Sequence, residues 1–116
     1  MSEHITEKTS ILPYREDIFA GRTEFRVSEH ALREAHKEGI RAKDIVYTIF
    51  TGEVVERYPD RRRVLISSPF RNTDLHLHVV CDYSDYHELV AVTVYIPTRS
   101  EWASPRQRRR WVKGDL

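Results

Sequence analysis

The sequence has a single cysteine, Cys81, among its 116 residues. One thiol excludes an internal disulfide and leaves too few thiols for a zinc finger. Disulfides are rare in reducing compartments, so the low cysteine content fits a cytoplasmic protein. No apolar run approaches the roughly 18 residues that a membrane-spanning helix needs. The first ten residues, MSEHITEKTS, are polar and acidic, unlike a secretory signal. We therefore expect a soluble cytoplasmic protein that does not contact a membrane.

Charge, by contrast, is abundant and unevenly distributed. Charged residues make up 32% of the chain, and the formal net charge is +1. Residues 1–60 hold nine Lys or Arg and twelve Asp or Glu, whereas residues 61–116 hold ten and six. A basic second half could attract a polyanion or an acidic protein, or it could simply be solvated.

Capping residues and apolar spacing predict helices in the first half of the chain. Ser28 is a good N-cap for a helix that Gly39 would end, and Gly52 would end the next one. Alternating or continuous apolar segments later in the chain predict strands. The order of helices followed by an antiparallel meander indicates an α+β fold. We expect helices at 14–21, 28–39, 42–52 and 104–112, and strands at 23–27, 53–58, 60–68, 75–83 and 88–96.

Two histidines in the segment LHLHVV (75–80) are the first candidates for a function. Successive side chains of a strand point to opposite faces, so His76 and His78 share one face. A hairpin with the following strand would place His78 opposite Thr93 and His76 opposite Tyr95. These four side chains would then form a polar and aromatic patch on the sheet face away from the helices.

A metal or thiol site does not fit this pattern. Two histidines supply two ligands, whereas a stable zinc site needs three or four. Cys81 should point into the core and behave as an inert thiol. We therefore expect no metal and no cofactor.

Several segments resemble a known family when they are taken in order. These are SEHALREAHKEGI, GEVVERYPDRRRVLI, LHLHVV and VTVYIP followed by Trp102. Together they resemble an uncharacterised bacterial domain family, a domain of unknown function that is similar to the RelE/ParE-like and BrnT-like toxins of toxin–antitoxin pairs. The resemblance implies arginines at the positions of Glu34 and Glu38, and these two departures favour binding over catalysis. The matching residues are His30, Gly39, Ile40, Gly52, Glu53, Tyr58, Pro59, His78, Thr93, Tyr95 and Trp102.

The resemblance implies a RelE/ParE-like fold, with two N-terminal helices on one face of a curved antiparallel sheet of about four strands. A short C-terminal helix or tail would follow. The implied organisation is an N-terminal extension (1–22) with a short helix, the RelE/ParE-like domain (23–103) and a basic tail (104–116). The resemblance also implies action on RNA or the ribosome, and a small antitoxin protein as partner. In members of the family, this antitoxin often contains a zinc finger.

Metal-independent RNA cleavage needs a base, an acid and a cation beside the phosphate. Histidine suits proton transfer near neutral pH, and arginine suits the charged phosphate. The candidate catalytic residues are His78, Tyr95, Arg63 and His30. Each has a structural alternative, as an exposed sheet residue or a packing side chain. The candidate RNA-binding residues are His76, Thr93, Arg106, Arg108, Arg109, Arg110 and Trp111.

The sequence therefore predicts a toxin-like RNA-acting protein, as a metal-independent endoribonuclease of the mRNA-interferase kind. The alternative is a non-catalytic module of the same fold that binds protein or RNA.

Overall fold

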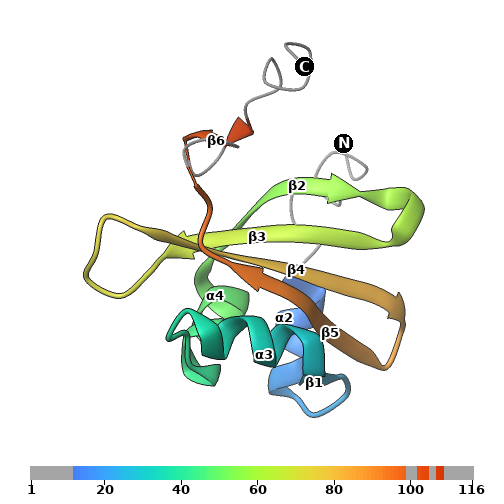
Figure 1. Cartoon of the computed structure of the whole chain (residues 1–116). Coiled ribbons are helices and arrows are strands. Elements are labelled where there is room, and N and C mark those ends of the chain that lie inside the picture. The colour runs from blue at the N-terminus through green and yellow to red at the C-terminus, as the bar shows by residue number, and fades with distance from the viewer. Residues whose placement is uncertain (1–11, 99–101, 105–106, 109–116) are drawn as a thin grey trace.

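The computed structural model describes residues 12–98, 102–104 and 107–108 (Figure 1). It is an α+β structure, as predicted. Its helices are α2 (Leu12–Phe19), α3 (Glu29–Lys37) and α4 (Ala42–Thr51), with the 3-10 turn η1 (Pro59–Arg61). Its strands are β1 (Glu24–Val27), β2 (Glu53–Tyr58), β3 (Arg63–Pro69), β4 (His76–Asp85), β5 (Glu88–Tyr95), β6 (Trp102–Ser104) and β7 (Gln107–Arg108). Among the described residues, no helix has the length and apolarity to cross a membrane.

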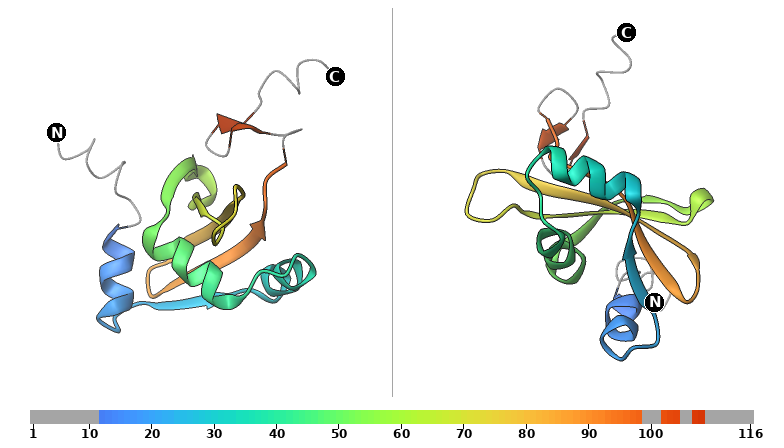
Figure 2. Two further views of the ribbon diagram at one scale, coloured as in Figure 1. Left: turned by 90° about the vertical axis from the view of Figure 1, so that its left-hand side faces the viewer. Right: turned by 60° about the horizontal axis from the view of Figure 1, so that its bottom comes forward.

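The main sheet has five strands in the order β1-β5-β4-β3-β2. Strands β2 to β5 form the predicted antiparallel meander, but β1 pairs with β5 in parallel. The expected antiparallel sheet of about four strands is therefore a mixed sheet of five. Local sequence patterns indicate that 23–27 is a strand, but they do not indicate which strand it joins. The sheet is strongly twisted, so that β1 and β2, at its two edges, run in different directions (Figure 2).

Local chemistry fixes the ends of the helices. The Ser28 hydroxyl accepts a hydrogen bond from the Ala31 amide at 3.0 Å, which confirms the predicted N-cap of α3. After this helix Gly39 adopts a left-handed backbone with φ of +72°. Helix α4 starts where the Asp44 carboxylate accepts a bond from the Arg41 amide at 2.8 Å. These contacts satisfy backbone donors that a helix leaves unpaired at its first turn.

The hydrophobic core lies between the helices and one face of the sheet. Because strand side chains alternate, this face carries every second residue of β3 and β4. In β5 the alternation is interrupted at Val92, between Ala91 and Val94. Ala31 and Ala35 of α3 and Ile45 and Ile49 of α4 pack on this face. From the sheet, the cluster contains Val64, Ile66, Leu77, Val79, Cys81, Leu89, Ala91 and Val94.

The C-terminal segment differs from the prediction where it can be compared. Residues 102–104 and 107–108 form the short antiparallel pair β6–β7, not part of a helix over 104–112. Arg108 lies in β7. The other predicted RNA-binding residues of the tail, Arg106, Arg109, Arg110 and Trp111, lie outside the described residues, as does most of the N-terminal extension.

Candidate functional site

The second face of the sheet carries the histidines, as predicted, but in another register. His78 pairs with Tyr95, and Val80 pairs with Thr93. The expected His78–Thr93 pairing is wrong by two residues, because the chain turns at Tyr86 and His87, between the paired Asp85 and Glu88, and not around Asp85 and Tyr86 as that pairing requires. The ladder also contains two irregularities, one in β5 and one in β4, which shift the register in opposite directions and cancel. A shift of two residues keeps each side chain on its face. His78, Thr93 and Tyr95 therefore still share the face opposite the core.

His78 and Tyr95 are in direct contact. The His78 Nδ1 and Tyr95 Oη atoms lie 3.3 Å apart in a hydrogen bond. The two rings meet edge to face, with centroids 5.3 Å apart. This arrangement joins an imidazole to a phenol, two groups that can both carry a proton.

The expectation of an open patch is wrong, because His78 is 0% exposed and Tyr95 is half-buried. Leu65 and Ser67, on the same face of β3, are buried as well. This face of the sheet is therefore shielded from solvent at Leu65, Ser67 and His78. Next to this region, His76 is half-buried and its Nδ1 has no hydrogen-bond partner among the described residues.

Arg63, the first residue of β3, forms an ion pair with Asp82 of β4 on this face of the sheet. Its Nε donates to Asp82 Oδ2 at 2.9 Å, between directly paired strand positions. Partial burial alone would raise the pKa of Asp82, but hydrogen bonds from Ser84 and Arg63 outweigh it and hold that pKa below its usual value. At neutral pH Arg63 therefore faces a negative charge, which reduces its capacity to bind a phosphate.

A cleft of about 440 Å³ opens beside this ion pair. It brings together Arg63 and Thr93, two residues predicted from the sequence. Tyr58 and Arg61 also line it, and they were not predicted as site residues. The available signal was the Tyr-Pro step before three consecutive arginines, which places an aromatic ring and several cations at one turn.

His30 does not join this site. It is exposed in the first turn of α3, whose Ala31 and Ala35 pack against the core face of the sheet. Among the described residues, no group of three or more His, Cys, Asp or Glu side chains is arranged to hold a metal ion. Cys81 is buried as predicted, and desolvation raises the pKa of its thiol.

The fold and this site define a small α+β domain with a cleft of mixed polar and apolar lining, which includes two arginines and Asp60, on the sheet face opposite its core. A family model described as "Domain of unknown function (DUF4258)" matches residues 27–96, which is more than half of the chain. The chain belongs to this family, and the predicted membership of a domain family of unknown function is confirmed. None of the curated proteins and none of the solved structures compared with the chain matches it.

Proposed function

We propose that this domain is a non-catalytic RNA-binding module, and that the cleft around Arg61 and Arg63 is its contact surface. The observation that supports the proposal is the grouping of two arginines with a tyrosine and a threonine in one 440 Å³ cleft on a sheet face, in which Asp60 is the one carboxylate of the lining. Proteins bind single-stranded RNA by combining cations for the backbone with aromatic rings for the bases.

Each part of the cleft has a role in this proposal. Arg61 lines the cleft and is exposed at the η1 turn, where its guanidinium group can reach a phosphate. Arg62 is exposed at the same turn but lies outside the lining, so in this proposal it contacts a phosphate of an RNA that extends past the cleft. The Tyr58 ring offers a surface on which a base can stack, while its hydroxyl bonds to the Glu56 carboxylate. Thr93 adds a hydroxyl within reach of a ribose.

Binding is preferred to cleavage because of burial and charge. A catalytic base must reach the proton it removes, and His78 has no exposed surface. Arg63 is already neutralised by Asp82.

A metal-independent endoribonuclease of the RelE/ParE-like toxin type, acting on free or ribosome-bound mRNA and neutralised by a small antitoxin, is the second candidate. The hydrogen bond between His78 and Tyr95 favours it, because the two groups can exchange a proton.

Binding can be tested by fluorescence anisotropy with a labelled single-stranded RNA over a range of salt concentrations. In the variant Arg61→Ala/Arg62→Asn, affinity at low salt should fall, and the slope of log K against log salt should decrease by about 1.4 if each arginine contacts one phosphate. Asn at position 62 tolerates the left-handed backbone there, with φ of 55°. Arg33→Ala, which removes an arginine from α3, should bind like the wild type.

Absence of salt-dependent RNA binding, or equal losses in both variants, would refute the binding proposal. The same RNA incubated with the protein in EDTA tests the second candidate. Cleavage by the wild type that is lost in a folded His78→Gln variant would favour the enzyme.

A further inference from the structure

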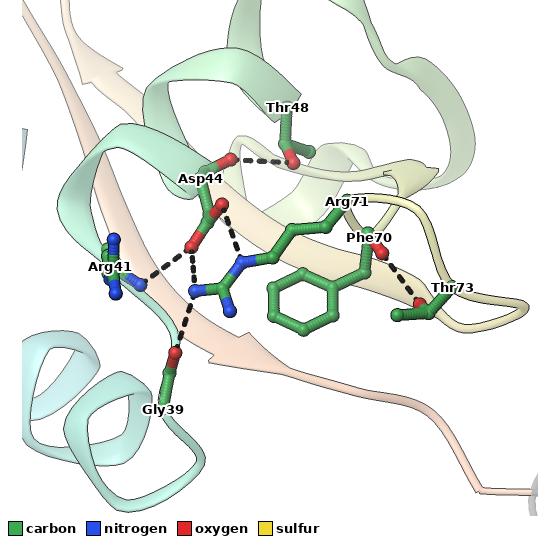
Figure 3. Close-up of polar contacts among 7 residues, drawn as sticks. All are labelled: Gly39, Arg41, Asp44, Thr48, Phe70, Arg71 and Thr73. Atoms are coloured by element: carbon green, nitrogen blue, oxygen red, sulfur yellow. Dashed lines mark hydrogen bonds and ion pairs between the residues drawn. The ribbon is translucent and has the colours of Figure 1, made fainter.

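A second, larger cleft lies between α4 and the loop that joins β3 to β4 (Figure 3). Its volume is about 580 Å³, within the range typical of small-molecule sites. Buried side chains of Thr48, Phe70 and Leu77 form part of its wall. Cationic and polar side chains from both elements complete the lining: Arg41, Lys43, Arg71 and Asn72, with the ring of Tyr47.

Arg71 is held rigidly in this cleft. Its Nη2 donates to Asp44 Oδ2 at 2.8 Å and to the Gly39 carbonyl at 2.9 Å, and its Nε donates to Asp44 Oδ1 at 3.3 Å (Figure 3). Its guanidinium also lies 4.6 Å from the centroid of the Phe70 ring. The Arg71 backbone has a φ of +55°, which is uncommon outside glycine and tends to occur at functional positions. These contacts fix the orientation of the guanidinium before any ligand arrives.

The charges of the lining do not cancel. Asp44 is its one carboxylate, and the ion pair with Arg71 offsets that charge. Arg41 and Lys43 are exposed, and neither takes part in any of the ion pairs of the described residues, although Lys43 is close enough to help lower the pKa of Asp44. The lining therefore has two uncompensated positive charges, which favour an anionic ligand.

The cleft also offers an aromatic contact. Tyr47 lines the cleft and is 58% exposed, so its ring is accessible to a bound ligand. A ligand with a negative group and a flat ring would meet the cations at one point and Tyr47 at another. We propose that this cleft binds a nucleoside 5′-monophosphate, with the phosphate at Arg41 and Lys43 and the base against Tyr47. The ligand is either a free nucleotide or the 5′-phosphorylated end of an RNA.

The test uses the full chain, with binding followed by NMR amide shifts on addition of AMP, adenosine or inorganic phosphate. AMP should shift the amides of Lys43, Tyr47 and Asn72 at concentrations where adenosine and phosphate do not. Lys43→Ala should weaken AMP binding roughly tenfold, the loss expected for one charge-assisted hydrogen bond. Lys37→Ala, which removes an exposed lysine of α3, should leave the affinity unchanged.

Tyr47→Leu measures the contribution of the base separately from that of the phosphate. This variant should bind AMP with an affinity closer to that of inorganic phosphate. A four-nucleotide RNA with and without a 5′-phosphate distinguishes the two sources of the ligand. Preference for the phosphorylated RNA over AMP indicates an RNA end, and the reverse indicates a free nucleotide.

The proposal is overturned if AMP shifts none of these amides, if phosphate binds as tightly as AMP, or if Lys43→Ala has no effect. It is independent of RNA binding at the other cleft. AMP binding should persist in Arg61→Ala/Arg62→Asn, so that one proposal can fail while the other stands.

Discussion

Arg15 links the N-terminal helix to the end of α4, and its removal should destabilise the fold. Its Nε donates to the Ile49 carbonyl and its Nη2 to the Gly52 carbonyl, each at 2.6 Å. These carbonyls lie at the C-terminus of α4, where a helix leaves acceptors unpaired and a positive charge is stabilising. Desolvation by burial lowers the pKa of Arg15, although the group stays charged.

The magnitude follows from the two bonds. A hydrogen bond from a charged donor contributes about 1.5–3 kcal/mol, and water can replace part of this at a half-buried position. We expect Arg15→Leu, which keeps the apolar stem, to lower the free energy of unfolding by about 2 kcal/mol. For a domain of this size the melting temperature would fall by roughly 8 °C.

Urea denaturation followed by circular dichroism measures the change. Arg22→Leu is the matched control, because Arg22 forms an exposed ion pair with Asp17 and should change stability by less than about 0.5 kcal/mol. Equal effects of the two substitutions, or no effect of Arg15→Leu, would refute the capping role.

Three further predictions concern the core and the sheet. Thr48→Val should lower the free energy of unfolding by about 1–2 kcal/mol, because the buried Ser68 hydroxyl then lacks the Thr48 hydroxyl that lies 2.7 Å away. Adding Ser68→Ala should restore part of this free energy, as measured by urea denaturation. Asp82 has a lowered pKa in the folded state, so its negative charge stabilises the fold above about pH 4. This contribution is lost as the pH falls through the folded-state pKa. The difference in free energy of unfolding between the wild type and Asp82→Asn should therefore vanish in acid. Cys81 should react with a thiol reagent only in denaturant, because it is fully buried and its pKa is raised; rapid labelling of the native protein would contradict this.

The sequence predicted features that depend on neighbouring residues. Ser28 and Gly39 bound α3 as expected, since a cap bonds to its own helix and a left-handed backbone suits glycine. The side-chain alternation in 75–80 placed His76 and His78 on the face opposite the core for the same reason. Such features need no knowledge of the distant chain.

Features that depend on distant residues were missed. The turn between β4 and β5 lies at Tyr86 and His87, one residue later than a turn centred on Asp85 and Tyr86, and this moves the partner of His78 from Thr93 to Tyr95. No glycine or proline in this segment marks the position of the turn. The burial of His78 depends on what covers the face, which alternation does not reveal. The Arg71–Asp44 pair joins positions 27 apart in the sequence, and its cleft exists only once α4 packs on the sheet.

The parallel pairing of β1 with β5 has a consequence for how the chain folds. Arg26 and Glu88, which join these strands in an ion pair, are 62 positions apart. During synthesis β1 is the first strand to leave the ribosome, and its partner β5 emerges only after almost the whole domain has been made. Closing so long a loop is slow, so the antiparallel meander should form early and β1 should dock in a late step of folding.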